Sequence, residues 1–399
     1  MNTAIYVFVG LLICKIMGYL TESLGTGRIL GYMIVGIVYG MLFGRQEYIG
    51  ELSLIAYISV IFTVFYTGLT SEYKDLFREL RISSILSSLS VMLSMSLIAT
   101  YLLTMNTSTP TALFIAIILS NTASEAIALI TDKIPPKLRT LSLSASLIDD
   151  LLVLVVSTIY ISMYSDSTSL YINIVNICVG IIILIALFSI IILYVKHHSI
   201  PYIVLNKLFR YMARESKYFI DISLLSLLTL VSISLILDTT PLIYAYLSGI
   251  IISLGTLTRD PMLKYRLRII EFSRFLSDLI NAVFIPLFFL YIGLFINTSM
   301  LSPVLALNLV LLCIPGKLVV YSTYVVLRER DILTGVKIGF AMCSRGVLEL
   351  ALLIMGFKAG LLDVYYLNTL IFTSLLLLVI SISTVSLINL WEKRYQLGP

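Results

Sequence analysis

Two adjacent aspartates, Asp149 and Asp150, lie in the middle of a long apolar segment of the sequence. An ionisable side chain at the centre of a membrane-spanning helix costs at least about 2.5–3.5 kcal/mol, so such residues mark ion or proton pathways by default. Neighbouring residues of a helix point about 100° apart, and the two carboxylates therefore cannot face one site. We expect one carboxylate to pair with Lys317, which lies in the middle of another apolar segment, and the other to face a water-filled cavity.

A neutral oxygen ligand is available beside this pair. Ser146 precedes Asp150 by four residues and therefore shares its helix face. A hard monovalent cation prefers oxygen ligands, by the same logic that holds for other hard ions. A carboxylate that binds either a proton or a cation, and never both, is already sufficient for exchange. The chemistry predicted is therefore exchange of a monovalent cation, bound at the aspartate that faces the cavity, for protons.

Polar residues interrupt two further apolar segments, Asn121 and its neighbours in segment 110–131 and Ser344-Arg345 in segment 332–357. Non-helical backbone is tolerated at membrane depth where it lines a cavity. We therefore expect both helices to break at these points and to cross there, with half-helix ends and polar groups beside the ion. The predicted ion- and proton-binding residues are Asp150, Asp149, Ser146, Asn121, Thr122 and Ser124, and the charges predicted to tie the crossed helices together are Glu125, Arg345 and Glu349.

The composition defines the elements that position these residues. The chain has 399 residues, of which 59% are hydrophobic and only 12% are charged, with a mean hydropathy of +1.04. A soluble protein carries about 25% charged residues. The chain is therefore predicted to be an all-α multi-pass membrane protein, because a spanning helix needs about 20 apolar residues. Thirteen segments fit, at residues 4–24, 28–43, 52–69, 82–104, 110–131, 140–163, 170–195, 217–237, 240–257, 275–296, 303–327, 332–357 and 365–391.

The basic residues predict the orientation of these helices. If the N-terminus lies outside, the cytoplasmic loops hold 21 of the 27 Lys and Arg residues, whereas the opposite loops hold only Arg45 and Lys358. Such a bias is typical of membrane proteins, whose cytoplasmic loops are rich in Lys and Arg. We therefore predict an N-out, C-in topology, and the net charge of +5 reflects this topology and not a nucleic-acid partner.

An internal repeat supports the count of thirteen. Residues of segment 110–131 recur in segment 332–357 at a shift of 224, and residues 66–69 recur as 291–294 at a shift of 225. Each match pairs an odd-numbered helix with an even-numbered one, so the two copies run oppositely through the membrane, as in many transporters. The predicted organisation is a single transporter domain over residues 1–399, with inverted repeats at about 1–163 and 217–391 and a linker helix at about 170–195.

Other classes of protein fit less well. An intramembrane aspartyl protease needs carboxylates from two different helices, and these two are neighbours on one helix, so no enzyme is expected. A continuous channel is disfavoured by a carboxylate paired with a lysine at mid-membrane. No cofactor is expected, since the four cysteines lie in apolar segments without metal-ligand spacing, and the glycine-rich stretch 31–44 favours close helix packing over a phosphate loop. An organic-anion transporter remains an alternative, although it would not require Asp150.

Several motifs resemble one known family, the monovalent cation/proton antiporters, and within it the second cation/proton antiporter branch. The most specific match surrounds the acid pair, at residues 142–152, and the other matches are 25–36, 65–69, 286–294, Lys317 and Ser344-Arg345-Gly346. The resemblance implies that Asp150 is the ion and proton site and that Asp149 pairs with Lys317. Two aspartates are typical of electrogenic members, so more than one proton per cation is expected. A homodimer in the cell membrane, with an elevator-like movement of a core domain, is also implied.

Three departures from the family pattern bear on the choice of ion. Segment 110–131 lacks the frequent acid or Ser followed by Pro, and the acid after Arg345-Gly346 is Glu349 rather than a Glu directly after the glycine. The chain ends at Pro399 without a nucleotide-binding regulatory domain, which argues against gated potassium efflux. The predicted function is exchange of Na⁺, with Li⁺ as a second candidate, for protons by alternating access, and the alternative is K⁺/H⁺ antiport.

Overall fold

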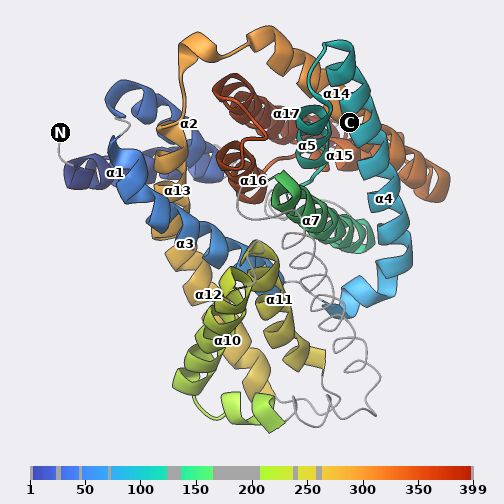
Figure 1. Ribbon diagram of the computed structural model, residues 1–399. Coiled ribbons are helices and arrows are strands. Elements are labelled where there is room, and N and C mark those ends of the chain that lie inside the picture. Colours follow the sequence, from blue (N-terminus) through green and yellow to red (C-terminus); the bar gives the residue numbers. More distant parts are fainter. Residues whose placement is uncertain are drawn as a thin grey trace.

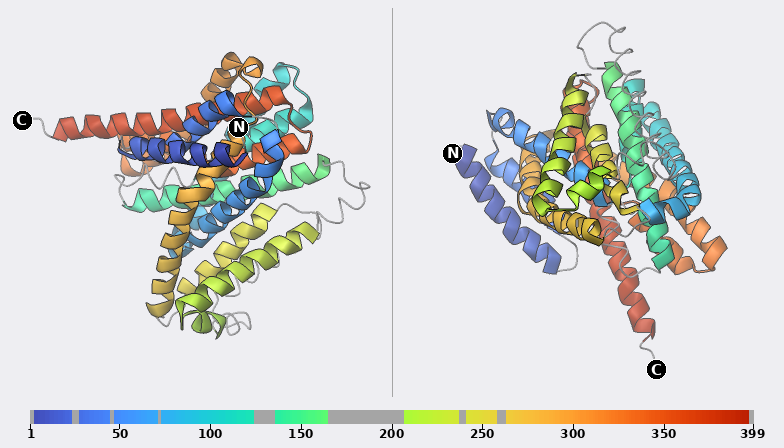
Figure 2. Two further views of the ribbon diagram at one scale, coloured as in Figure 1. Left: turned by 90° about the vertical axis from the view of Figure 1, so that its left-hand side faces the viewer. Right: turned by 90° about the horizontal axis from the view of Figure 1, so that it is seen from below.

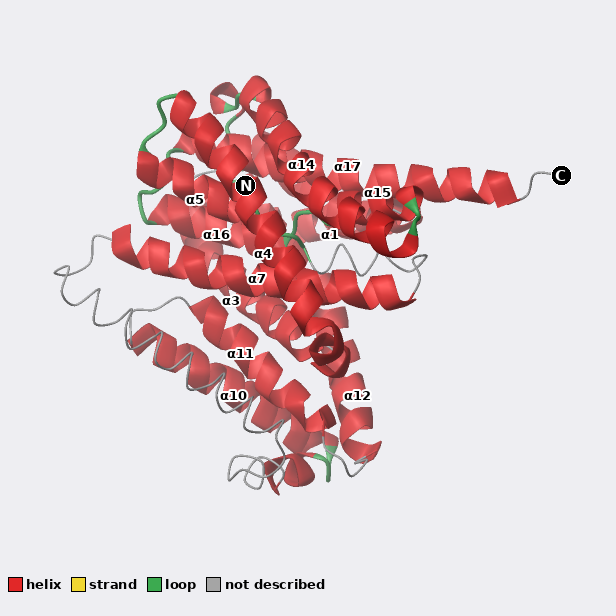
Figure 3. Cartoon of the chain, turned by 90° about the vertical axis from the view of Figure 1, so that its right-hand side faces the viewer, coloured by secondary structure: helices red, strands yellow, loops and turns green. Residues whose placement is uncertain are grey.

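The computed structural model describes residues 3–23, 28–44, 47–70, 73–123, 136–164, 207–236, 241–257 and 263–396. Every regular element in these ranges is a helix (Figure 3). Eight of the helices are long and apolar enough to span a membrane. The prediction of an all-helical chain with several membrane-spanning segments is therefore confirmed. The count of thirteen stays a prediction, because the segment 170–195 lies outside the described residues.

The helices pack into two groups (Figure 1). We name them the glycine-packed group and the charge-bearing group after the features described below. The glycine-packed group consists of α1 (Thr3–Ser23), α2 (Arg28–Phe43), α3 (Glu47–Thr70), α10 (Ser216–Ile236), α11 (Pro241–Ser253), α12 (Leu263–Leu279) and α13 (Ile285–Gly293). The charge-bearing group consists of α4 (Tyr73–Thr104), α5 (Thr109–Leu119), α7 (Pro136–Tyr164), α14 (Pro303–Glu329), α15 (Ile332–Ala341), α16 (Val347–Lys358) and α17 (Val364–Gln396).

Glycines allow the helices of the first group to approach closely. A Cβ atom on Gly293 of α13 would lie 1.9 Å from the carbonyl oxygen of Gly36 on α2. A Cβ atom on Gly249 of α11 would lie 2.3 Å from the carbonyl oxygen of Phe65 on α3. Small residues at such contacts are the usual device by which membrane helices bring their backbones together. The expectation that the stretch 31–44 serves close helix packing is thus confirmed at Gly36.

Capping residues fix where several helices of the second group begin. The hydroxyl of Ser302 accepts a hydrogen bond from the Leu305 amide at 3.3 Å, and Pro303 follows it at the first helical position of α14. The carboxylate of Asp331 accepts from the Thr334 amide at 3.1 Å at the start of α15. Such side chains satisfy amide groups that have no partner within the helix. The predicted starts at residues 303 and 332 are therefore correct.

Two predicted boundaries differ from the structure. The helix expected at 275–296 begins at Leu263 and continues through a π-helical turn, Ile280–Phe284, to Gly293. The helix expected at 82–104 begins at Tyr73. Apolarity identifies only the part of a helix that crosses the hydrocarbon, whereas charged residues continue a helix beyond it. Arg268 and Glu271 form such a continuation, with an ion pair of 2.8 Å at spacing i, i+3.

Two predicted helices are interrupted. Among the described residues of the segment 110–131, the helix ends at Leu119 and residues 120–123 are non-helical. The segment 332–357 is interrupted at residues 342–346, between α15 and α16. Residues 124–135 lie outside the described part of the chain. The crossing of two complete discontinuous helices and the inverted relation of the two repeats therefore stay predictions.

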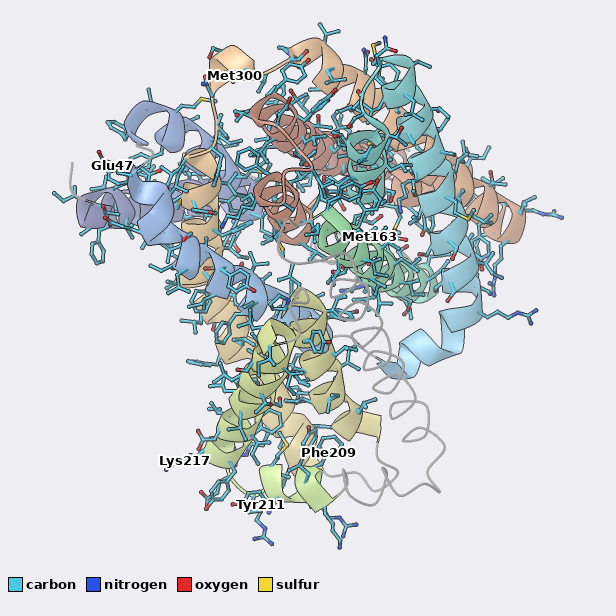
Figure 4. All side chains as sticks on the ribbon, in the orientation of Figure 1. Glu47, Met163, Phe209, Tyr211, Lys217 and Met300 are labelled. Atoms are coloured by element: carbon cyan, nitrogen blue, oxygen red, sulfur yellow. The ribbon has the colours of Figure 1, made fainter. Side chains whose placement is uncertain are left out.

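The labelled residues at the helix ends lie at two opposite ends of the glycine-packed group. Glu47, at the start of α3, lies at the opposite end of the glycine-packed group from Lys217, at the start of α10 (Figure 4). Phe209 and Tyr211 lie at the same end as Lys217. The helix α17 extends beyond the other helices towards the C-terminus (Figure 2). Which of these ends is cytoplasmic stays a prediction.

Candidate functional site

The buried ion pair of Asp149 and Lys317 joins α7 to α14. The Lys317 Nζ atom lies 2.5 Å from Asp149 Oδ2, and both side chains are fully buried. The Ser87 hydroxyl donates to Asp149 Oδ1 at 2.5 Å, and the ammonium group of Lys317 donates to the Ser90 hydroxyl at 3.2 Å. Burying two charges is tolerated only when further hydrogen bonds satisfy the groups that remain. The two serines of α4 supply those bonds, and the structure brings together the pair that the sequence singled out.

A stripe of buried serines on α4 was missed in the sequence. These residues are spaced by four, three and four positions, which places them on one helix face, and all four are fully buried: Ser83, Ser87, Ser90 and Ser94. Ser94 packs against Gly316 of α14, the residue before Lys317. A Cβ atom on Gly316 would lie 2.2 Å from the hydroxyl oxygen of Ser94. The signal was present, since hydroxyl groups at helical spacing within an apolar helix predict a buried polar partner.

Asp150 lies at a small pocket between the two helix groups. Its side chain is 4% exposed, and the Asn121 amide nitrogen donates to Asp150 Oδ1 at 3.0 Å. The other polar atom of that amide, Asn121 Oδ1, is buried and has no hydrogen-bond partner. The pocket has a volume of about 20 Å³, which is roughly the space of one water molecule. Its lining residues are Val64, Thr67, Asn121, Ala123, Asp150, Tyr246, Gly346, Val347, Leu348 and Glu349.

The two helix breaks bind directly to one another. The Ala123 amide donates to the Ser344 carbonyl at 3.0 Å, and the Thr122 hydroxyl donates to the Met342 carbonyl at 2.8 Å. Backbone groups freed by the breaks thus find partners in the opposite break, as buried polar groups must. The proton of the Thr122 hydroxyl is therefore engaged in this contact, and Thr122 is not among the residues that line the Asp150 pocket.

Arg345 ties the two breaks together by its side chain. Its guanidinium group donates to the carbonyl oxygens of Leu119 and Asn121, at and just beyond the end of α5. A cation is favourable at this position, because the end of a helix presents unpaired carbonyl groups. Arg345 Nε also lies 3.2 Å from Glu349 Oε2, and the Ser374 hydroxyl donates to Glu349 Oε1 at 2.7 Å. Glu349 therefore contacts Arg345, which joins the two breaks, and also lines the Asp150 pocket.

Ser146, the remaining predicted ligand among the described residues, does not line this pocket. The Ser146 hydroxyl donates to the Leu143 carbonyl at 2.9 Å, and Ser146 is not among the pocket-lining residues. The shared helix face with Asp150 was correctly identified, but the pocket extends from Asp150 towards α3, α11 and α16 instead. Ser124 and Glu125 lie outside the described residues.

These features define a class of protein. Buried, paired charges, a carboxylate at a pocket between two helix groups, and interrupted helices in contact are those of a multi-pass membrane transporter. The family model described as "Sodium/hydrogen exchanger, transmembrane" matches residues 5–390. The chain therefore belongs to the sodium/hydrogen exchanger family, and the resemblance to cation/proton antiporters is confirmed. Its family is one of transporters.

A solved structure shares this fold. The sodium proton antiporter MjNhaP1 from Methanocaldococcus jannaschii, solved at pH 8, aligns with a TM-score of 0.73 and 16% sequence identity. The alignment covers 97% of this chain and 98% of that one. No curated protein matches this chain in a sequence comparison.

Proposed function

We propose that this protein exchanges Na⁺ for protons across the cell membrane, with Asp150 holding either the cation or a proton. One observation carries the proposal. Asp150 and Asn121 line one pocket of about 20 Å³, and the buried Asn121 side-chain oxygen has no hydrogen-bond partner that a cation would have to displace. Carboxylate and amide oxygens are the ligands that hard cations prefer. Thr67 supplies a further hydroxyl oxygen in the same lining.

The proposed transport cycle is alternating access. The Asp150 pocket lies between the glycine-packed group and the charge-bearing group, so a displacement of one group against the other would expose it to either side in turn. Asp150 and Asn121 move together, because both belong to the charge-bearing group and its breaks, which Arg345 joins, whereas Thr67 belongs to α3 of the glycine-packed group. We further propose that the glycine-packed group forms the interface of a homodimer, against which the other group moves.

The proposed exchange is electrogenic, with more than one proton for each cation. The Asp149–Lys317 pair supplies a second ionisable unit beside Asp150, and it is held by hydrogen bonds from α4. One elementary charge moved across 100 mV corresponds to about 2.3 kcal/mol. An imposed potential in proteoliposomes should therefore drive exchange. An exchange rate that does not respond to voltage would reject the unequal stoichiometry.

The variant Asp150→Asn tests the role of Asp150. Everted vesicles are loaded with a ΔpH-quenched dye, and the dequenching caused by added Na⁺ is measured. We expect the exchange rate of Asp150→Asn to be at least about 100-fold lower than that of the wild type, because an amide cannot release a proton when it binds a cation. The matched control is Asp278→Asn, which makes the same change at an exposed residue of α12 and should retain exchange. Normal rate and affinity in Asp150→Asn would sink the proposal.

Two alternatives concern the substrate. Exchange of Li⁺ or K⁺ for protons would use the same pocket, and a competition series with the three cations on the purified protein separates them. Transport of an organic anion is disfavoured, because the pocket is lined by two acidic residues, Asp150 and Glu349. An organic-anion transporter would also remain active in Asp150→Asn.

A further inference from the structure

A second, larger cavity lies between the two helix groups. Its volume is about 300 Å³, and its walls come from α3, α7, α11, α13 and α16. It is adjacent to the Asp150 pocket but distinct from it. Val60 of this cavity and Val64 of the Asp150 pocket are one turn apart on α3, and Ala351 and Val347 are one turn apart on α16. The cavity therefore continues the boundary between the groups towards the end of α16.

The lining of this cavity is unsuited to the transported cation. Most of its wall is apolar, formed by residues such as Ala56, Val60, Leu242, Phe288, Ile354 and Met355. Among the described residues that line it, Lys358, in the last turn of α16, is the only charged one, and none carries a carboxylate. An ammonium group without an acid beside it repels a cation. The cavity therefore suits a ligand that is apolar over most of its length and negatively charged at one end.

Lys358 is available for an anionic group. Its ammonium group lies 5.8 Å from the centre of the Tyr291 ring, and among the described residues no carboxylate forms an ion pair with it. Tyr291 also lines the cavity, and its buried hydroxyl has no hydrogen-bond partner. A buried polar group left unpaired costs about 1–3 kcal/mol, which an acceptor on a ligand would offset. The Lys358 ammonium group and the Tyr291 hydroxyl group thus both favour a negatively charged hydrogen-bond acceptor on the ligand.

The volume of the cavity suits one hydrocarbon chain. An apolar cavity of about 150 Å³ is known to hold a benzene molecule. A cavity of about 300 Å³ therefore holds roughly ten to twelve carbon atoms, which is one acyl chain and not the two chains of a phospholipid. Each buried methylene contributes about 0.8 kcal/mol to binding. The affinity of such a chain therefore rises with its length, and its charged end sets its orientation. The surrounding bilayer is a reservoir of such chains.

We propose that this cavity binds a single-chain fatty-acid anion, with its carboxylate at the Lys358 ammonium group and its chain against Val60, Leu242 and Ile354. The occupant fills the space between α3 of one group and α16 of the other. The site is separate from the proposed cation pocket, and its occupancy does not depend on Asp150.

Binding of laurate to the full-length protein in nanodiscs of a zwitterionic lipid tests this proposal. The measurement is the laurate-dependent rise in the thermal unfolding midpoint, which follows the ligand concentration relative to Kd. Dodecylammonium, with the same chain length and opposite charge, is the matched probe. A binding measurement is preferable to a ΔpH assay, because fatty acids themselves carry protons across bilayers. We expect the wild type to bind laurate at least 10-fold more tightly than dodecylammonium.

Variants separate binding at this cavity from partition into lipid. Lys358→Gln should weaken laurate binding at least 10-fold, and Lys358→Glu should reverse the preference towards dodecylammonium. Ala56→Phe, which fills the cavity without changing its charge, should weaken both probes. Lys264→Glu, an equal change of charge at an exposed residue of α12, should leave laurate binding unchanged. Unchanged laurate binding in both Lys358 variants, or equal binding of the two probes to the wild type, would overturn the proposal.

Unfolding measurements on the same samples distinguish failure of the fatty-acid site from failure of the proposed Na⁺/H⁺ exchange. Asp150→Asn should lose the stabilisation caused by Na⁺ and keep that caused by laurate. Loss of the laurate response in wild type with an intact Na⁺ response would refute only the fatty-acid site.

Discussion

All the buried charged side chains among the described residues lie in the charge-bearing group, and the described part of the glycine-packed group buries none. These side chains are Asp149, Asp150, Lys317, Lys337, Arg345 and Glu349. The glycine-packed group instead brings backbones together at Gly36, Gly40, Gly68, Gly249 and Gly293. Close backbone packing at glycines distinguishes the first group, whereas buried ion pairs and hydrogen bonds between broken helices distinguish the second.

The difference shows where stability and chemistry reside. A buried ion pair is weak evidence for stability, because the cost of removing charges from water can exceed their mutual attraction. Close backbone packing has no such cost and fixes the distance between helices. We infer that the glycine-packed group acts as a frame, whereas the charge-bearing group keeps costly groups because they serve exchange. Substitutions in the two groups should therefore fail in different ways.

The largest expected effect on stability comes from Lys317→Met in the charge-bearing group. This variant leaves the Asp149 carboxylate buried without its ion-pair partner, which typically costs about 3–5 kcal/mol. The lowered midpoint of thermal unfolding of the purified protein measures the effect.

The double variant Lys317→Met with Asp149→Asn is the control for this prediction. Replacing both partners of a buried pair is often neutral. The double variant should therefore recover most of the lost stability. Two single effects that simply add in the double variant would contradict a coupled pair.

A smaller effect is expected from Gly293→Ala in the glycine-packed group. The added methyl group meets the Gly36 carbonyl oxygen at 1.9 Å, so α2 and α13 must separate. Overpacking of this kind costs about 1–3 kcal/mol. The rate of Na⁺/H⁺ exchange per folded molecule should remain near normal, because no charge is disturbed.

Gly50→Ala is the matched control for the glycine prediction. Nothing lies within 4 Å of a Cβ atom at Gly50 of α3, so the same substitution should not destabilise the protein there. It should even stabilise the helix by about 0.5–1 kcal/mol. Equal unfolding midpoints of the two variants would contradict close packing at Gly293.

The smallest effect is expected at the edge of the charge-bearing group, from Asp331→Ala. The Thr334 hydroxyl and amide donate to this carboxylate, and these hydrogen bonds lower the pKa of Asp331 below its ordinary value. Loss of such a helix cap costs about 1 kcal/mol. A lowered pKa gives stability that is present above the ordinary pKa and is lost as pH falls through the lowered one.

Unfolding measured against pH checks the cap prediction. The wild type should exceed Asp331→Ala in stability at neutral pH. The difference should begin to shrink near the ordinary aspartate pKa of about 4 and should vanish only below the lowered pKa of the folded protein, where the carboxyl group is protonated. Asp331→Asn is the control, since asparagine caps helices as well as aspartate does. A difference that persists in acid would assign the effect to something other than the charged cap.

Much of the site could be predicted from residue types alone. A charge is so costly in a membrane that Asp149, Asp150 and Lys317 had to be paired or functional, and the geometry of a helix separates the two aspartates. The polar residues near Asn121 and Arg345 predicted the helix breaks, because an apolar segment has no other reason to contain them. The family resemblance then assigned Lys317 to Asp149, and the 2.5 Å ion pair agrees with that pairing.

Other features depend on tertiary contacts that no sequence pattern specifies. The helix face of Ser146 was predictable, but which neighbouring helix provides the pocket for Asp150 depends on how the groups pack. The π-helical turn at Ile280–Phe284 leaves no signal in hydropathy. The serine stripe of α4, including Ser87 and Ser90, was visible in the sequence, but its partners on α7 and α14 were not.

Proton release on cation binding tests the central claim most directly. Na⁺ is added to purified protein in weakly buffered solution, and the protons released are followed with a pH-sensitive dye, with choline chloride as the control for ionic strength. If Asp150 holds either a proton or a cation, the wild type releases protons in proportion to the Na⁺ bound, and Asp150→Asn releases none. Na⁺ binding without proton release, or equal release from Asp150→Asn, would contradict competition at Asp150.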